Sequence, residues 1–385
     1  MSEIKVNSIK GVGASAAAIT VNNSDGTCTD NITNNLSNRN KIINGAMSVH
    51  QRGTSSTGIT GSGYYTADRM QLVLANGGTW TNTISTDTPD GFAASYKLDC
   101  TTADASLGAG DLVLFRQIIE GHNLQDFAKG TSSAKQFTVS FYVKTNKTGT
   151  YVCELLDDTN SRIVAKSYTV SDTNWNRYTV TFPADTSGTI ADSNVAGLYV
   201  HFWLAAGTNF TSGTQQTSWA TNTVANRVAG LNVNIADSTS NEWYITGIQL
   251  EVGSVATDFE HRSFGQELAL CQRYFYQATI IGSTSEVSNK PICVGTMFSS
   301  SDMRAIIDFP FEMRAEPTLS SNDNSNSYYI QSSGGADFFD RLDAYAITKK
   351  RATVRNTSHV NGTGGQAGIV AQETGDSNLS FSAEL

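Results

Sequence analysis

The chain has 385 residues, which is enough for two domains that each bury a core of their own. Charged residues make up only 16% of the sequence and the formal net charge is −9, so a nucleic-acid partner is not expected. With 33 glycines, five prolines and no apolar run of about 20 residues, neither a collagen-like stalk nor membrane insertion is expected.

Residues 1–38 form a polar leader, which we expect to anchor the chain in a larger assembly. The segment ITVNNSDGTCTDNIT predicts two short strands around a turn at Ser24-Asp25-Gly26. An isolated hairpin of this size is marginal in water, so the leader should be ordered only against a partner. Flexible disorder is the alternative for so polar a segment.

Residues 39–262 carry the pattern of half-buried antiparallel strands. Segment 40–53 predicts a strand, a turn at Asn44-Gly45 and a second strand, and a later strand breaks at Asn76-Gly77-Gly78. Apolar residues then alternate with polar ones in four runs, 137–143, 178–182, 198–204 and 231–235. These runs predict a single jelly-roll-like β-sandwich.

The last strand of this sandwich changes its register midway. Trp243 and Ile245 alternate in one register, whereas Ile248 and Leu250 alternate in the shifted one. An extra residue exchanges the two faces of a strand, and glycine tolerates the twist. The pattern therefore predicts a β-bulge at Gly247.

Residues 263–277 predict a short helix that links the sandwich to a second domain. Ser263 and Gln266 have the spacing of a capping box, in which each side chain satisfies a free backbone N–H group. Leu268 and Cys271 then fall on one helical face.

Residues 278–385 predict a smaller C-terminal β-domain. The candidate strands are 292–298, 305–309, 327–331, 342–348, 352–355, 368–371 and 379–383. Pro310 and Pro317 cannot donate to a ladder, so the segment between them should lie at an edge or a corner. The whole chain is therefore expected to be all-β, with an antiparallel sandwich, a linking helix and a second β-domain.

Several segments resemble one group of viral proteins. Segments 40–53 (NKIINGAMSVHQRG), 65–70 (YTADRM) and 243–277 resemble bacteriophage tail fibres. In particular they resemble the carbohydrate-binding-module-like sandwich of fibre and receptor-binding proteins from marine and cyanobacterial phages. The opening residues 1–23 are similar to the amino-terminal segments of that group. Residues 309–321 (FPFEMRAEPTLSS) are similar to its carboxy-terminal domains.

The resemblance implies a virion protein, a homotrimer in a tail appendage. The leader would bind tail proteins, and the last domain would point outward to a host surface glycan or protein. The opening residues lack the apolar core of a signal peptide, so we expect synthesis in the host cytoplasm. A purely structural virion component without receptor contact, such as a capsid-borne fibre or a tail adaptor, is the alternative.

An enzyme is not expected, and no catalytic residue is predicted. A polysaccharide depolymerase, which is a further alternative, would use paired acids on a groove-bearing scaffold. The sequence contains no recognisable acidic, nucleophile or metal motif.

The strand at residues 198–204 offers a candidate carbohydrate or receptor site. If its apolar set points inward, Tyr199, His201 and Trp203 line the other face. Aromatic rings stack on the C–H face of a pyranose, and histidine supplies hydrogen bonds. The alternative is that a loop, a neighbouring subunit or the next domain covers this face.

A second candidate site lies in the C-terminal domain. Tyr328, Tyr329, Phe338 and Phe339 flank polar loops and could form a host-facing aromatic patch. Packing at a three-fold interface is the alternative, since sheet edges and faces must be covered.

No cofactor is expected, although structural calcium is an open possibility at two places. Asp157, Asp158 and Asn160 lie close together in the sequence, and residues 22–25 form a similar polar loop. Calcium prefers such oxygen ligands. Turns rich in Asp and Asn that hold no metal are the alternative.

Overall fold

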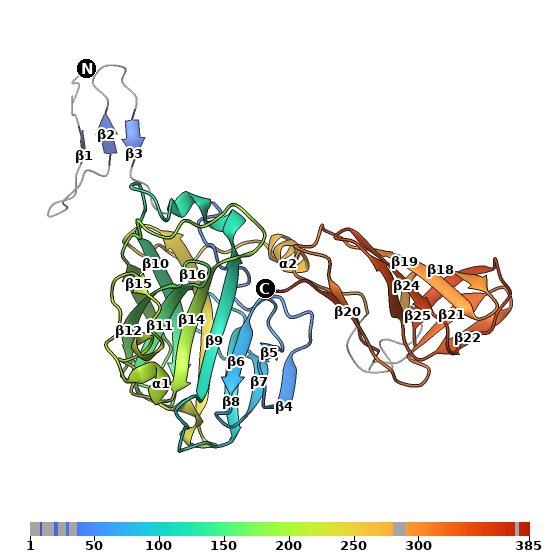
Figure 1. Ribbon diagram of the computed structural model, residues 1–385, viewed down its shortest axis with the longest axis horizontal. Helices are drawn as coiled ribbons and strands as arrows, with labels where there is room; N and C mark the ends of the chain where they lie inside the picture. The colour runs from blue at the N-terminus through green and yellow to red at the C-terminus, as the bar shows by residue number, and fades with distance from the viewer. Residues whose placement is uncertain (1–7, 10–18, 22–27, 31–36, 280–289, 374–376) are drawn as a thin grey trace.

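The computed structural model describes residues 8–9, 19–21, 28–30, 37–279, 290–373 and 377–385. Over these ranges the chain is all-β, as predicted, with a large sandwich and a smaller β-domain that a short helix joins (Figure 1). The two hydrophobic cores span residues 42–250 and 297–383. Within the described ranges no helix combines the length and apolarity needed to cross a membrane.

The leader contributes a small antiparallel sheet. Its strands are β1 (Ser8–Ile9), β2 (Ile19–Val21) and β3 (Cys28–Asp30), in the order β1-β2-β3. The two predicted strands correspond to β2 and β3, which pair with each other. The predicted turn at Ser24-Asp25-Gly26 lies outside the described residues.

Two antiparallel sheets form the sandwich. The six-stranded sheet has the order β13-β10-β16-β8-β7-β4, and the seven-stranded sheet has the order β15-β12-β11-β14-β9-β6-β5. The strands of the first are β4 (Ser55–Ile59), β7 (Thr79–Ser85), β8 (Ser95–Thr102), β10 (Phe137–Thr145), β13 (Asn176–Phe182) and β16 (Glu242–Val252). Those of the second are β5 (Gly63–Tyr64), β6 (Gln71–Ala75), β9 (Leu112–Glu120), β11 (Gly149–Asp157), β12 (Arg162–Val170), β14 (Ala196–Ala206) and β15 (Ala220–Thr221).

Short helical turns lie in the connections. They are η1 (Gly121–Phe127), α1 (Thr208–Thr211), η2 (Val224–Asn226) and η3 (Ile235–Asp237).

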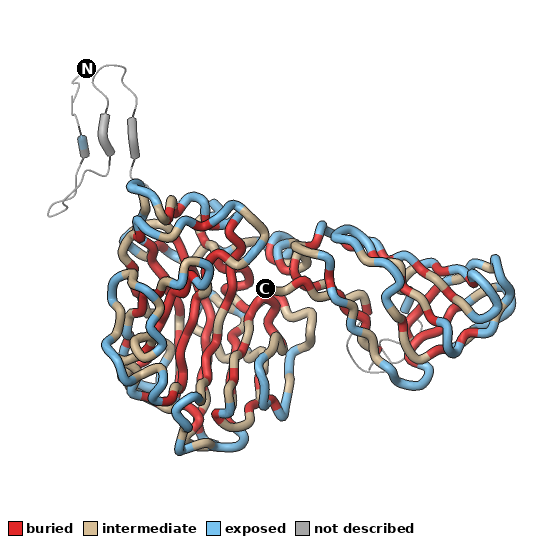
Figure 2. The backbone as a smooth tube through the Cα atoms, viewed as in Figure 1, coloured by how far each residue is buried: buried red, intermediate tan, exposed pale blue. Residues whose placement is uncertain are grey.

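The alternating apolar residues of both sheets meet in one core. Phe141 of β10 and Phe202 of β14 are buried, with their ring centroids 4.8 Å apart. Figure 2 shows buried residues along the middle of the sandwich strands and exposed ones in many of the loops. Burial of each large apolar side chain contributes about 1.5–3 kcal/mol, so the period-two pattern specifies which face of each strand points inward.

The predicted bulge is present in β16. Gly247 has a φ of +62°, and the pairing of β16 with β10 shifts between Thr246 and Gln249. Ile245 and Ile248 are therefore both buried although they are three residues apart. A Cβ atom at Gly247 would lie 2.7 Å from the Phe92 ring, so glycine is required there on steric grounds as well.

The two strands predicted in segment 40–53 are absent, so that prediction is wrong. Asn44 and Met47 have positive φ angles of 60° and 57°, which end any extended run. The Asn44 side chain accepts a hydrogen bond from the Val49 N–H and donates to the Val49 carbonyl. Such bonds give the backbone an alternative to a ladder, and here they hold a buried irregular segment.

Residues 231–235 likewise form no strand, although Val233 and Ile235 are buried as the alternation indicated. Asn232 instead bonds to the end of β11, where its side chain accepts from the Thr150 N–H at 2.7 Å. The Asn234 side chain then accepts from the N–H of Ala236 and begins η3.

The linking helix is α2 (Phe264–Gln272), and it begins with the predicted capping box of Ser263 and Gln266. It is shorter than the predicted range 263–277, because Phe275–Gln277 forms strand β17 of the smaller domain. Cys271 is buried at the joint together with Tyr274.

The smaller domain contains a seven-stranded sheet, β22-β21-β25-β18-β19-β24-β23, and a three-stranded sheet, β17-β26-β20. Its other strands are β18 (Lys290–Ser299), β19 (Asp302–Asp308), β20 (Thr318–Ser321), β21 (Tyr328–Ser332), β22 (Gly335–Phe339), β23 (Asp343–Ile347), β24 (Arg351–Asn356), β25 (Ala367–Gln372) and β26 (Leu379–Ser382). Each of the seven predicted strands overlaps an observed one, whereas β20 and β22 were not predicted.

The end of β26 ties the smaller domain back to the sandwich. The carboxylate of Glu384 forms ion pairs with Arg69 and with Arg52, the latter at 3.1 Å. Arg69 is buried, and its guanidinium lies 3.5 Å from the centre of the Tyr274 ring. A buried charge is tolerated when it is paired and hydrogen-bonded, so these contacts define one arrangement of the two domains.

Two further arginines reinforce the joint. Arg273, at the end of α2, makes two hydrogen bonds of 2.9 Å to the carboxylate of Glu120 on β9. Arg314 donates to the Ala383 carbonyl at 2.7 Å and to the Asn194 carbonyl at 2.9 Å. Charge-assisted bonds of this kind are stronger than neutral ones, and they hold both sides of the joint.

Replacing Glu384 with alanine leaves the buried guanidinium of Arg69 without its carboxylate. We expect the free energy of unfolding to fall by about 3–5 kcal/mol. The matched control is Glu312→Ala, because Glu312 is exposed and pairs with Lys350 at 3.6 Å. The control should lose less than about 1 kcal/mol. Urea denaturation of both variants measures the difference, and equal losses would contradict a buried, paired joint.

Candidate functional site

A polar row crosses the outer face of the seven-stranded sheet in the sandwich. Gln71, Arg116, His201 and Glu154 are successive register partners on β6, β9, β14 and β11. Partners directly opposite in an antiparallel pair have side chains on the same face, about 5 Å apart. The register therefore aligns four polar residues that lie far apart in the sequence.

One end of this row is buried, and its carboxylate is hydrogen-bonded by three side chains. The carboxylate of Glu154 accepts from Nδ1 of His201 at 2.7 Å and from Nε1 of Trp203 at 2.9 Å. It also accepts two hydrogen bonds from Arg227, at 2.7 and 2.8 Å. Because Arg227 belongs to the loop at residues 207–231, this ion pair fastens the loop over the sheet.

The network fixes the protonation states of its members. Burial raises the pKa of Glu154, but the hydrogen bonds from His201 and Arg227 outweigh it and hold that pKa at about 2. Burial lowers the pKa of His201 to about 4, although the hydrogen bond to Glu154 and the charge of Glu154 both act to raise it. At neutral pH a neutral imidazole therefore donates from Nδ1, and its buried Nε2 has no hydrogen-bond partner among the described residues.

Two of the three residues predicted on β14 to contact a ligand are not accessible. Trp203 is fully buried and packs against Leu114, Val152 and Val228. His201 is buried beside it. A loop that covers this face was one of the alternatives. In the structure, apolar residues of the loop at residues 207–231 bury this part of the face.

The third residue, Tyr199, remains half-exposed at the open end of the face. The guanidinium of Arg116 lies 5.2 Å from the centre of its ring, and Nε of Arg116 donates to Oε1 of Gln71 at 2.6 Å. Burial and then the charge of the exposed Asp158 raise the pKa of Tyr199. We refer to Tyr199, Arg116, Gln71 and Asp158 as the Tyr199 patch. Sequence reasoning missed Arg116, although a charged residue in the apolar run LVLFRQII was a visible signal.

Two of the four aromatic residues predicted in the C-terminal domain, Tyr328 and Phe339, are part of the second core. Tyr328 and Phe339 are buried and stacked, and the Tyr328 hydroxyl donates to the Asn378 carbonyl at 2.8 Å. Tyr329 is buried as well, 5.4 Å from the ring of Phe338. Of the four predicted residues, Phe338 alone is exposed, at 40%.

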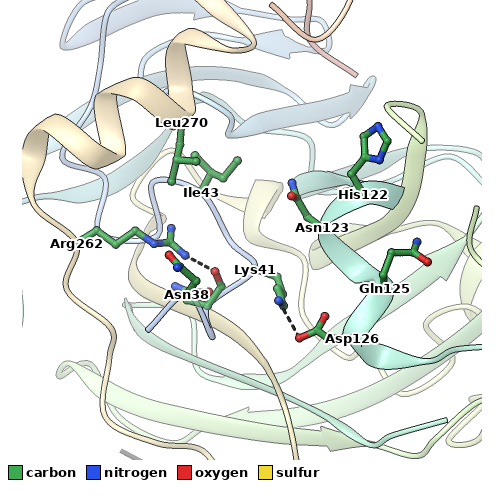
Figure 3. A pocket seen from close by; sticks show the side chains of 10 residues that line it. Asn38, Lys41, Ile43, His122, Asn123, Gln125, Asp126, Arg262 and Leu270 are labelled. Carbon is green, nitrogen blue, oxygen red and sulfur yellow. Dashed lines mark hydrogen bonds and ion pairs between the residues drawn. The ribbon is translucent and has the colours of Figure 1, made fainter. Parts of the chain in front are cut away.

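A hollow of about 430 Å³ lies between η1, the end of the leader and the segment that leads into α2 (Figure 3). Lys41 forms an ion pair of 2.9 Å with Asp126, and Arg262 donates to the Ile42 carbonyl at 3.0 Å. The described residues that line it include the imidazole of His122 but no Phe, Tyr or Trp side chain. Because these charged groups are already paired, His122 is bound to Asp192 at 2.6 Å and no Phe, Tyr or Trp ring is available for stacking, the hollow fits a sugar less well than the Tyr199 patch does.

In the first proposed calcium loop, a lysine ammonium group already pairs with one of the carboxylates considered as calcium ligands. The ammonium group of Lys129 is buried against Asp157, and the Asn160 amide donates to the same carboxylate at 2.9 Å. Lys129 also pairs with Asp185 at 3.0 Å. The other candidate loop, residues 22–25, lies outside the described part of the chain. Within the described part, no group of three or more His, Cys, Asp or Glu residues could hold a metal ion.

Comparison with known proteins gives structural similarity alone. No family profile matches the chain, and no curated protein matches its sequence. The enzymatically active domain of bacteriophage CBA120 tailspike protein 4 is 12% identical, with a TM-score of 0.30, over 56% of this chain and 22% of that one. A family 11 carbohydrate-binding module from a cellulase of Clostridium thermocellum is 14% identical, with a TM-score of 0.26, over 53% of this chain and 99% of that module.

A xylan-binding domain of carbohydrate-binding module family 22, from Paenibacillus barcinonensis, is 10% identical with a TM-score of 0.26. It covers 52% of this chain and 94% of that domain. The chain spans about a fifth of the length of the tailspike domain. At these TM-scores the similarities carry no argument about function, and the β-sandwich is established by its own sheets.

Replacing Arg227 with alanine leaves the Glu154 carboxylate buried beside a neutral imidazole. We expect a loss of about 3–5 kcal/mol in the free energy of unfolding. The control is Arg341→Ala, because the Arg341 side chain and its two partners, Asp323 and Asp343, are all exposed, each pair being 3.2 Å apart. That variant should lose less than about 1 kcal/mol in the same urea titration. A neutral effect of Arg227→Ala would show that the loop is held by packing alone.

The depressed pKa of His201 predicts a dependence of stability on pH. Between its ordinary pKa of 6.5 and its folded value of about 4, the unfolded chain binds a proton that the folded chain does not. Stability therefore rises with pH across this window, and His201 accounts for a change on the order of 3 kcal/mol. Urea titrations of the wild type and of His201→Gln from pH 4 to 7 should converge towards pH 4. If the free energies of unfolding of the two proteins changed in parallel with pH, the assignment of this pH dependence to His201 would be refuted.

Proposed function

We propose that this protein is a tail-fibre protein of a phage virion and that it attaches the particle to a host surface by binding glycans. The leader binds the tail, the chain associates as a homotrimer, and the Tyr199 patch contacts sugar. The observation that carries the proposal is the Tyr199 patch itself, an open group of polar and aromatic side chains on adjacent strands. The segments that resemble phage fibre proteins support the same function.

The chemistry of the patch suits a neutral sugar. The Tyr199 ring offers an apolar surface to pyranose C–H groups. The guanidinium of Arg116 and the amide of Gln71 donate hydrogen bonds to hydroxyl groups, and the carboxylate of Asp158 accepts them. Since the ring, the guanidinium and the amide stand on β14, β9 and β6, little conformational freedom is lost on binding.

The joint between the domains suits an attachment fibre. The buried pair of Arg69 and Glu384 and the paired Arg273 hold the smaller domain in one orientation. A single shallow site binds a sugar weakly, but three linked copies engage a surface with much greater avidity. A fixed joint maintains the spacing on which that gain depends.

We propose binding without hydrolysis. A glycosidase needs two carboxyl groups about 5–9 Å apart on either side of the scissile bond. Asp158 is exposed in the patch, whereas Glu154 is buried and engaged by Arg227. The Glu154 carboxylate is therefore withheld from a substrate.

A structural virion component without receptor contact is the second candidate. It is favoured by the burial of five of the seven residues predicted to contact a receptor. These are His201, Trp203, Tyr328, Tyr329 and Phe339.

Glycan binding is tested with the purified chain on an array of bacterial surface polysaccharides, followed by affinity measurement on the tightest ligand. Tyr199→Ala removes the stacking ring, so we expect affinity to fall at least ~10-fold, the equivalent of about 1.4 kcal/mol. Tyr142→Ala is the control, because Tyr142 is half-exposed on the other sheet. Absence of any ligand, or equal affinity of the two variants, favours the structural role.

A further inference from the structure

The seven-stranded sheet of the smaller domain exposes an apolar outer face. Five large side chains on four of its strands are between 50% and 69% exposed: Val294, Phe298, Ile306, Tyr345 and Ile369. We call these residues the apolar sheet face. The outer face of an antiparallel sheet is ordinarily polar, so this composition is not explained by the fold of one chain.

The strand register places these residues side by side. On β19, Ala305 and Ile307 point into the core, whereas Ile306 between them points outward. Val294 of β18 pairs with Ile369 of β25 on the same outer side. Adjacent strands lie about 4.8 Å apart, so these side chains form a continuous surface.

Arg304 lies between the aliphatic side chains of the apolar sheet face and its two aromatic rings, Phe298 and Tyr345. The guanidinium of Arg304 lies 3.7 Å from the centre of the Phe298 ring and 4.5 Å from that of Tyr345. Its charge is balanced by Asp302 at 2.7 Å. The Arg304 side chain therefore packs against both rings.

The charges around the face are of both signs, and most of them are paired. Arg355, which lies opposite Arg304 and 5.3 Å from the centre of the Tyr345 ring, forms no ion pair within the described residues. Arg351 lies 3.0 Å from Asp308, and Arg341 lies 3.2 Å from Asp343. A three-fold ring closes through heterologous contacts, in which one part of the face on each copy meets a different part on the next copy.

The size of the face fits such an association. The five side chains expose on the order of 500 Å², which is within the roughly 300–600 Å² of the largest apolar patch on a typical monomer, and such a patch is often functional. A standard protein interface buries roughly 800 Å² per partner, so polar residues around the face would have to contribute to the contact as well.

We propose that the apolar sheet face packs against the same domain in other copies of this chain and forms the contact that holds the oligomer together. This proposal rests on the homotrimer of the proposed function and assigns its interface. Burial of the apolar centre drives the association, and the paired rim charges restrict its orientation.

The test is the mass of the full chain by light scattering after gel filtration. Val294→Lys and Ile306→Lys each place a charge in the centre of the face. Val255→Lys is the matched control, because Val255 is 67% exposed on the sandwich and Val294 is 69% exposed. We expect trimers for the wild type and the control, and association at least ~10-fold weaker for the two variants. Thermal unfolding of the variants at low concentration checks that each chain still folds.

A monomeric wild type overturns the proposal, and so do trimeric Val294→Lys and Ile306→Lys variants. Glycan affinity of the monomeric variants separates this result from the proposed function. A monomer that still binds its glycan as tightly per site retains the Tyr199 patch and has lost only the interface. Loss of glycan binding in Val294→Lys at unchanged mass would place a ligand on this face instead and would also overturn the proposal.

Discussion

The burial of the Arg69 guanidinium determines how the two β-domains fit together. A charge in that position must meet a carboxylate, and Glu384 reaches it from the end of the last strand. The chain therefore has to bring β26 back to the sandwich before the charge is compensated. The ring of Tyr274 covers the same guanidinium, which makes the segment after α2 part of the same constraint.

The need of a buried charge for a partner of opposite charge also determines which surface of the sandwich is accessible. Glu154 is buried on the outer sheet face and draws Arg227, with its loop, over Trp203. The covering ends beyond His201, so Tyr199 is left at the margin of the covered area. The candidate site therefore lies where the loop held by this ion pair ends and the sheet face becomes accessible. Its residues on β6, β9 and β14 are held in place because these strands also contribute to the core.

The features that the sequence predicts correctly are local. Alternation identifies strands such as β10 and β14, and neighbouring residues identify the bulge at Gly247 and the capping box of Ser263. The features that it does not predict depend on distant pairs. Arg227 and Glu154 are 73 positions apart, and Arg69 and Glu384 are 315 apart, so no local pattern could indicate that Trp203 is covered or that β26 returns. In segment 40–53, side-chain bonds of Asn44 prevailed over strand propensity.

The central claim is that the open end of the outer sheet face binds glycan. Hydrogen–deuterium exchange of the full chain with and without its tightest polysaccharide ligand tests this most directly. The account predicts slower exchange in β6, β9 and β14 around Gln71, Arg116 and Tyr199, with little change in the smaller domain. Protection confined to β22 around Phe338, or to the hollow beside Lys41, would contradict it.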